Sequence, residues 1–183
     1  MEDLRSCFSI KNLGEASHYL GCHITRDRQA GTLKLDQHRY IQTVARRFDI
    51  KRTSVIPAAT GTKPLSKSEA PQKEAEVEEI HHIPYWKAVG ALMWAATMTR
   101  PDLSHTAQQL ARLNDNPGPA HWKAAMRAMQ YLWRTKDLGI TYGGGLECDI
   151  KLSAWVNADH ATCTDTRRSV SGGAVMLRDG AIS

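Results

Sequence analysis

The sequence predicts an α+β protein made of a β-hairpin with a helix, a helical bundle, and an incomplete antiparallel β piece. Three observations predict this class. Short apolar runs bounded by turn residues occupy both ends of the chain. Apolar residues at three- and four-residue intervals fill its middle. The chain of 183 residues is 42% hydrophobic, which is enough to form a buried core.

Residues 1–56 are expected to form the hairpin and the first helix. Two strand-like runs, 19–24 and 32–35, flank a polar connection that ends in Gly31. From 37 to 49 the pattern becomes helical, with apolar side chains on one face and arginines on the other. The apolar residues are Tyr40, Ile41, Val44, Ala45 and Phe48, and the arginines are Arg39, Arg46 and Arg47.

Residues 57–83 are rich in proline and glutamate, and they are expected to form a flexible or loosely ordered linker. Residues 84–137 predict three helices, because three separate stretches carry apolar residues at helical spacing. The expected inner faces are Tyr85, Val89, Leu92, Met93 and Ala96 on the first helix, Leu103, Ala107 and Leu110 on the second, and Trp122, Ala125, Met126, Met129, Leu132 and Trp133 on the third. These helices should pack together as a bundle, since none can bury its stripe alone. Thr99 is the expected cap of the second helix, and Pro101 is expected in its first turn.

Residues 138–183 change to a strand pattern. The segments "LGITYGGG", "KLSAWVNA", "SVSGGAVML" and "GAIS" have strand character with turns between them. They are expected to be the opening antiparallel strands of a further domain, with one strand edge left unpaired.

Charge favours a polyanionic partner, because the net charge is +5 and the pI is about 9.1. Residues 1–60 contain ten Lys/Arg against six Asp/Glu, so the basic surplus lies on the hairpin and its helix. A solvated basic surface without a ligand explains the same counts. No apolar run is long enough to span a membrane, and no secretion signal is recognisable. The cysteine spacing matches no zinc framework. We therefore expect no membrane partner, no metal site, and an intracellular protein, cytoplasmic or nuclear.

Several longer segments resemble one family in the same order along the chain. They are "FSIKNLGEASHYLGCHITRD", "LKLDQHRYIQTVARRFDI", "YWKAVGALMWAATMTRPDLSHTAQQLARL", "HWKAAMRAMQYLWRTKDLGITY" and "DTRRSVSGGAVML". The sequence is similar to the Pol polyprotein of copia-type LTR retrotransposons over nearly its whole length except residues 57–83. The resemblance implies the C-terminal part of a reverse transcriptase, running through the thumb and connection into the start of ribonuclease H.

The same resemblance implies that this chain by itself is a fragment without polymerase activity. The family's catalytic aspartates lie in a Tyr-x-Asp-Asp turn, and no Asp-Asp pair occurs here. Nucleotidyl transfer uses two Mg²⁺ ions held by such carboxylates. Mg²⁺ is thus implied for the intact family enzyme, and no cofactor is expected for this chain alone.

Nucleic-acid contacts are the expected residual activity. The resemblance identifies the hairpin with the primer grip, where Gly21 would allow close backbone approach and where His23, Arg26 and Arg28 would meet phosphates. The arginine face of the first helix would track a duplex or RNA–DNA hybrid without reading its sequence. Lys123 and Arg127 on the third bundle helix would add to the basic surface, although Arg127 could instead cover apolar neighbours. The rest of the Pol polyprotein is a further implied partner.

The stretch Asn157-Ala158-Asp159 matches a position where the family usually has Asp-Ala-Asp. The first of those aspartates resembles the first catalytic carboxylate of ribonuclease H. A neutral amide at that position removes a negative charge from the metal site, so we expect a vestigial site. Two other hypotheses stay open: a host-adopted protein–protein interaction module, and a ribonuclease H-type nuclease completed by another chain.

Overall fold

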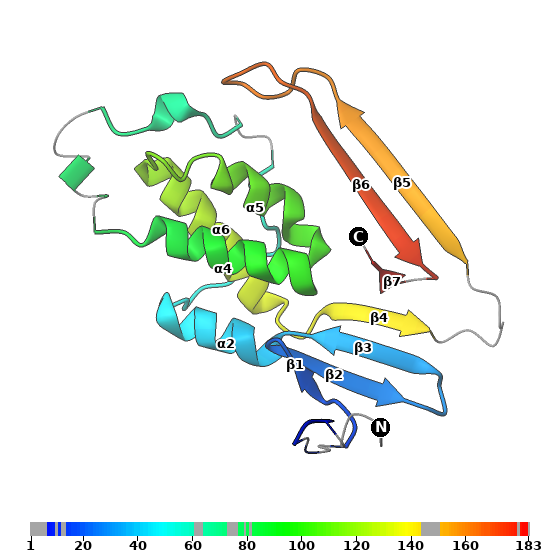
Figure 1. Ribbon diagram of the computed structural model, residues 1–183. Helices are drawn as coiled ribbons and strands as arrows, with labels where there is room; N and C mark the ends of the chain where they lie inside the picture. The colour runs from blue at the N-terminus through cyan, green and yellow to red at the C-terminus, as the bar shows by residue number, and fades with distance from the viewer. Residues whose placement is uncertain are drawn as a thin grey trace.

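The computed structural model describes residues 7–9, 11, 14–60, 64–72, 77–78, 80, 82–143, 151–178 and 180–182. Within them the protein is mixed α and β, with two antiparallel sheets and four α-helices (Figure 1). The predicted α+β class is confirmed in this coarse form. The strands are β1 (His18–Tyr19), β2 (Cys22–Asp27), β3 (Thr32–Asp36), β4 (Gly139–Gly143), β5 (Leu152–Asp159), β6 (Val170–Leu177) and β7 (Gly180–Ala181). The helices are α2 (His38–Arg47), α4 (Tyr85–Met98), α5 (Ser104–Ala111) and α6 (Pro119–Arg134), with short 3-10 helices η1 (Lys67–Glu69) and η2 (Pro101–Leu103).

The first sheet has the strand order β1-β2-β3-β4. The expected hairpin is present as β2 and β3, paired antiparallel with Ile24 opposite Leu35. Its first strand is shorter than expected, because Leu20 and Gly21 form a tight turn between β1 and β2. Both residues have positive φ, 48° and 79°, as a two-residue type I′ hairpin turn requires. The single strand expected over 19–24 is therefore wrong.

Strand β4 completes this sheet by pairing antiparallel with β3. This pairing corrects the expectation that grouped residues 139–143 with the C-terminal strands; Gly144 and Gly145 of the same motif lie outside the described residues. The close approach depends on glycine: a Cβ built on Gly139 would lie 2.1 Å from the backbone oxygen of Leu35. Local periodicity predicts a strand but cannot tell which sheet it joins.

Helix α2 belongs to the helical core and does not stand apart with the hairpin. Its Ile41 and Val44 share one buried cluster with residues of α4, α5 and α6. The expected inner faces of α2 and α5 are confirmed, but on α4 the expected core residue Met93 is 40% exposed. Ala88 and Ala95 are buried in that helix instead. Because α4 is apolar nearly all around, periodicity alone could not select its inner face.

The segment "TRPD" joins α4 to η2 through a buried arginine. Arg100 is 1% exposed, and its guanidinium donates to both carboxylate oxygens of Asp102, at 2.9 and 2.7 Å. It also donates to the backbone oxygen and the hydroxyl of Thr135 after α6, at 3.0 and 2.7 Å. Thr99 does not cap the second helix as expected, because its hydroxyl donates to Oε1 of Gln37 at 2.9 Å.

Part of the described segment 57–83 packs against the bundle, where Leu65 and Ile83 lie against the buried cluster. Ser66 is buried and caps η1, while Nε2 of the fully buried His121 lies 3.0 Å from the backbone oxygen of Ser66. The Gly118 N–H donates to Nδ1 of the same ring at 2.8 Å, so the proton of the neutral ring is on Nε2 and points at Ser66. One buried histidine thus ties η1 to the start of α6.

The second sheet consists of β5, β6 and β7 in that order, and the long β5–β6 hairpin runs along one side of the bundle (Figure 1). Its loop docks through Asp165, which accepts from the Ser66 hydroxyl at 2.5 Å and from Arg112 at 3.0 Å. At its other end, the Tyr142 hydroxyl of β4 donates to the backbone oxygen of Ala181 at 2.6 Å. In the part of the chain that the structure describes, no helix has both the length and the apolar character needed to span a membrane.

Candidate nucleic-acid interface

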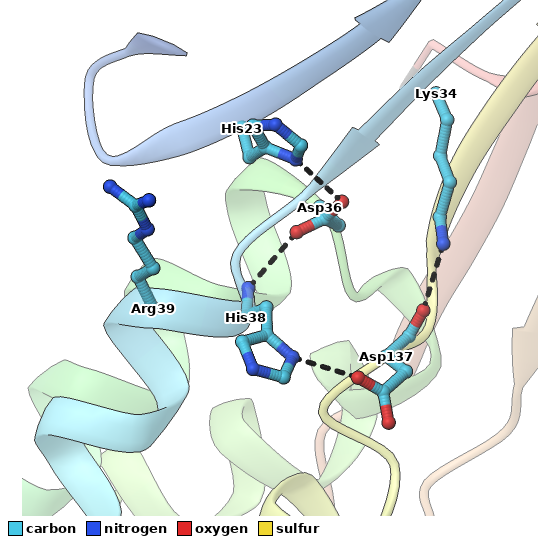
Figure 2. Close-up of a pocket in the computed structure, with 6 residues that line it drawn as sticks. All are labelled: His23, Lys34, Asp36, His38, Arg39 and Asp137. Atoms are coloured by element: carbon cyan, nitrogen blue, oxygen red, sulfur yellow. Dashed lines mark hydrogen bonds and ion pairs between the residues drawn. The ribbon is translucent and has the colours of Figure 1, made fainter. Parts of the chain in front are cut away.

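A cavity of about 290 Å³ lies where the first sheet meets the start of α2 (Figure 2). It brings together two of the sequence-predicted residues, His23 and Arg39, which lie on different elements. Four further residues line it: Lys34, Asp36, His38 and Asp137. The chain reaches this place three times, through the hairpin, the first turn of α2, and the turn after α6.

Each histidine in the cavity faces a carboxylate. Nδ1 of His23 lies 3.3 Å from Oδ2 of Asp36, and Oδ1 of Asp36 accepts from the His38 N–H at 3.2 Å in the first turn of α2. Nδ1 of His38 lies 2.7 Å from Asp137 (Figure 2). Hydrogen bonds from Lys136 and His38, in that order, hold the pKa of Asp137 below its usual value. The cavity wall therefore combines both signs of charge.

The Arg39 guanidinium makes none of the bonds drawn in the cavity and extends from α2 away from the His38–Asp137 pair (Figure 2). Arg39, Arg46 and Arg47 are all exposed, as expected from the sequence. None of the three side chains forms an ion pair with another described residue. Their helix cannot shift easily, because its opposite face is part of the core. The geometry therefore presents three cations from one rigid element.

The other predicted hairpin residues lie away from this cavity. Arg26 and Arg28 line a second cavity, of about 440 Å³, which Arg178 from the end of β6 also lines. Arg28 forms an ion pair with Glu15, so part of its charge is already balanced. A Cβ on Gly21 would have nothing within 4 Å, and the positive φ of this residue gives glycine a role in the turn itself.

Lys123 is exposed on α6, and Arg127 is partly buried one turn later. Helix α6 contacts the residue that follows α2 through an aromatic pair, Phe48 and Trp122, whose ring centroids are 6.4 Å apart. Arg47 and Lys123 are each the chain neighbour of one of these aromatic residues. Arg47 and Lys123 thus lie on either side of the contact between the Phe48 and Trp122 rings.

Asn157 and Asp159 occupy one face of β5, since side chains of alternate residues point the same way. Both are exposed, and they lie opposite Gly172 and Val170 of β6. Among the described residues, no three His, Cys, Asp or Glu side chains come close enough to hold a metal ion together. An amide and one carboxylate do not fit the pair of hard cations that the resemblance implies for the intact enzyme.

Sequence reasoning missed three features of these sites. Asp137 follows α6 by a few residues and meets His38 across 99 positions of the chain, which no local pattern indicates. Arg178 joins the hairpin cavity only because the second sheet docks beside the first. Lys34 lies in the expected strand 32–35, and no local pattern indicates that its Nζ donates to the backbone oxygen of Asp137 at 3.0 Å.

Known proteins similar to this chain include transposon polyproteins. The chain is 36% identical over 182 residues to the retrovirus-related Pol polyprotein from transposon TNT 1-94 of Nicotiana tabacum, covering 99% of this chain and 14% of the relative. It is 30% identical over 183 residues to the retrovirus-related Pol polyprotein from transposon RE2 of Arabidopsis thaliana, covering 100% of this chain and 12% of the relative. It is also 35% identical over 104 residues to the secreted RxLR effector protein 161 of Plasmopara viticola, covering 57% of this chain and 72% of the relative.

No protein-family model matches the chain, and no solved structure gives a significant match. The chain spans about one seventh or less of the length of the two polyproteins that it matches from end to end. The identity nevertheless extends through both sheets, the bundle and the segment between them. Over nearly its whole length, the chain is thus homologous to proteins named retrovirus-related Pol polyproteins from transposons, which agrees with the copia-type Pol resemblance of its sequence motifs.

Proposed function

We propose that this Pol segment binds the sugar–phosphate backbone of a nucleic-acid duplex or RNA–DNA hybrid without reading its sequence. The observation that carries the proposal is the row of exposed arginines on α2, Arg39, Arg46 and Arg47, which lack an ion-pair partner among the described residues. Fixed cations of this kind attract phosphates and release condensed counterions when they bind. Backbone contacts of this type position a protein on a duplex but carry no sequence information.

The hairpin supplies a second group of basic residues for the same backbone. Arg26, Arg28 and Arg178 surround the larger cavity, and Asp27, the acidic residue of its lining, already accepts from the N–H groups of Gln29 and Ala30 in the hairpin turn. His23 contributes less, because Nδ1 of its ring faces Asp36. We expect phosphates to lie outside the smaller cavity, where the charge is positive, and not within it.

The finer correspondence to the family is also part of this proposal. The hairpin and α2 correspond to the primer grip and thumb of a reverse transcriptase, α4 to α6 to its connecting helices, and β5 to β7 to the first strands of ribonuclease H. In this reading the rest of the Pol polyprotein supplies the catalytic carboxylates and their Mg²⁺ ions. This chain binds the sugar–phosphate backbone of the nucleic acid.

Salt-dependent binding tests the proposal. A fluorescently labelled RNA–DNA hybrid is titrated with the protein, and anisotropy gives the affinity between 50 and 200 mM salt. Each phosphate contact contributes about −0.9 to the slope of log K against log salt on a duplex. Changing Arg39, Arg46 and Arg47 together to Gln should therefore reduce the magnitude of the slope by about 2 to 3. Affinity for hybrids of unrelated sequence should fall equally.

A matched control removes the same charge elsewhere. Lys87, Arg167 and Arg168 are exposed and lie on other elements than α2, namely α4 and the β5–β6 loop. Their combined change to Gln gives the same net charge and should leave the slope nearly unaltered. If both triple variants reduce the salt slope and the affinity equally, the net charge of the protein and not the α2 surface attracts the hybrid, and the proposal fails.

A further inference from the structure

The smaller cavity borders the basic surface of α2, because Arg39 belongs to both (Figure 2). Its lining residues are His23, Lys34, Asp36, His38, Arg39 and Asp137. Two of these side chains are cations and two are carboxylates, so the charges of the lining cancel while both histidines are neutral. Histidine is the side chain whose ordinary charge change falls between pH 5 and 8. The two histidines therefore decide whether the cavity is neutral or positive.

The His38 ring can take a second proton without losing its carboxylate partner. Its Nδ1 lies 2.7 Å from Oδ1 of Asp137, and an ionised carboxylate only accepts, so Nδ1 carries the proton of the neutral ring. Its Nε2 lies 2.7 Å from the amide nitrogen of Gln42 and accepts from it. When Nε2 is protonated, a rotation of the Gln42 amide presents its oxygen in place of its nitrogen. The side chain is 35% exposed, so the charge forms next to water.

The His23 ring is arranged in a similar way on β2. Its Nδ1 lies 3.3 Å from Oδ2 of Asp36, and no described residue bonds to its Nε2. The ring of His18 on β1 faces it, with centroids 5.0 Å apart, and opposes the charged form of His23 only when it is charged itself. A second proton on Nε2 of His23 therefore breaks no hydrogen bond to a described residue.

The other titratable groups around the two rings do not ordinarily change charge between pH 5 and 8. Nζ of Lys34 donates to the backbone oxygen of Asp137 at 3.0 Å, and Nζ of Lys136 lies 3.2 Å from the carboxylate of the same residue. Burial, followed by the charge of Asp36, raises the pKa of the neighbouring Cys22 thiol and keeps it neutral. The change in charge of the lining over this range thus comes from its two histidines.

Building on the proposed backbone binding, we propose that this cavity is a pH-dependent phosphate subsite of the same interface. With neutral rings, the carboxylates of Asp36 and Asp137 repel a phosphate, and the nucleic-acid backbone stays outside at Arg39. With both rings protonated, an imidazolium balances each carboxylate, and a phosphate can enter between Lys34 and Arg39. Lys34 keeps donors for it, because an ammonium has three N–H groups and one of them serves the backbone oxygen of Asp137.

Proton uptake and nucleic-acid binding are then coupled in both directions. A bound phosphate favours the charged form of the two rings, and protonation of the rings strengthens the binding of the phosphate by the same factor. The histidines thus regulate how closely the backbone approaches α2. The arginines of α2 provide the attraction that is present at every pH.

The affinity for a labelled RNA–DNA hybrid, measured by anisotropy at pH 8 and at pH 5.5 in the same salt, tests this coupling. An exposed pair of opposite charges changes an equilibrium by up to about fivefold, so the parent protein should bind about five- to twentyfold more tightly at pH 5.5. His23→Asn combined with His38→Asn should remove most of this difference. Asparagine keeps an amide N–H near the position of Nδ1 but takes up no proton.

His105→Asn combined with His160→Asn is the matched control. Both histidines are exposed, and they lie on α5 and directly after β5. This variant should keep the pH ratio of the parent protein. If both double variants lose the ratio equally, general protonation of the protein and not the cavity causes it, and the inference is overturned.

Calorimetry at pH 7 in two buffers with different heats of ionisation counts the protons directly. Each coupled histidine contributes a fraction of a proton at this pH, so the parent protein should take up roughly half to one proton per bound molecule. The variant with both cavity histidines changed should take up clearly fewer. If this variant does not fold, as judged by circular dichroism, the single variants serve, and each should lose about half of the effect on a logarithmic scale.

The two proposals fail in different ways. If the protein shows no salt-dependent binding at either pH, the proposed backbone binding is wrong and this inference is wrong with it. If binding depends on salt and on the arginines of α2 but is equally tight at pH 8 and pH 5.5, only the inference is overturned. The same holds if the variant without the cavity histidines keeps the pH ratio of the parent protein.

Discussion

Replacing Arg100 by methionine tests what holds the ends of α4 and α6 together. Methionine keeps most of the apolar stem and removes the guanidinium. The guanidinium makes two bonds to Asp102 and two to Thr135, all between 2.7 and 3.0 Å, from a side chain that is 1% exposed. The change leaves the Asp102 carboxylate without its cation and a backbone oxygen without its donor.

The expected loss of unfolding free energy follows from the exposure of the partner left behind. Breaking a buried ion pair costs about 3–5 kcal/mol. The Asp102 side chain is 38% exposed, so water can partly replace the lost cation, and we expect the lower end, about 3 kcal/mol. In a chain of this size each kcal/mol lowers the melting temperature by about 2–4 °C, so Tm should fall by roughly 6–12 °C.

Urea unfolding at neutral pH, followed by circular dichroism, measures the change. Arg134→Met is the matched control, since Arg134 is exposed at the end of α6 and should change stability by less than about 0.5 kcal/mol. The free energies of unfolding of the parent protein and the Arg100→Met variant should become more similar in acid. Burial opposes ionisation of Asp102, but the hydrogen bond and charge of Arg100 and the bond from Tyr131 hold its folded-state pKa below the ordinary 3.8. The pair therefore stabilises the fold above that ordinary pKa and loses its effect as pH falls through the lower folded value. If Arg100→Met lowers the free energy of unfolding at neutral pH no more than Arg134→Met does, this reasoning is refuted.

Two other changes probe the junctions between the sheets and the helices. Gly139→Ala should destabilise the protein by about 1–3 kcal/mol, because the new Cβ would meet the backbone oxygen of Leu35 at 2.1 Å. The same change at Gly172, where a Cβ would have open space, is the control and should have little steric cost. Equal urea midpoints for the two variants would contradict the packing of β4 against β3. Hydrogen bonds from the Thr166 hydroxyl and N–H lower the pKa of the Cys163 thiol to about 7. Thr166→Val should raise that pKa toward the ordinary 9, as followed by the ultraviolet absorbance of the thiolate against a Cys163→Ser baseline. Because the pKa of this thiol is lower in the folded than in the unfolded protein, the thiolate stabilises the fold above the ordinary pKa of 9. This contribution should disappear as pH falls through about 7. An unshifted thiol titration in the Thr166→Val variant would show that Thr166 does not lower the pKa.

Several parts of the candidate interface were predictable because their information is local. The exposed faces of Arg39, Arg46 and Arg47 follow from helical spacing, since three consecutive turns place apolar and basic residues on opposite sides. The hairpin likewise follows from two apolar runs around a turn ending in Gly31. The exposure of Met93 did not follow, because a helix that is apolar nearly all around has no unique inner face in its sequence.

The sequence by itself determined the resemblance to transposon Pol polyproteins, the order of the main helices, and the outward arginines of α2. The tertiary structure alone decided that β4 joins β3, that Asp137 meets His38, and that Arg100 is buried between α4 and α6. The physical reason is the range of the interactions. Periodicity records which side of an element avoids water, whereas partners distant in the chain are chosen by the packing of whole elements, which leaves little trace in any short segment.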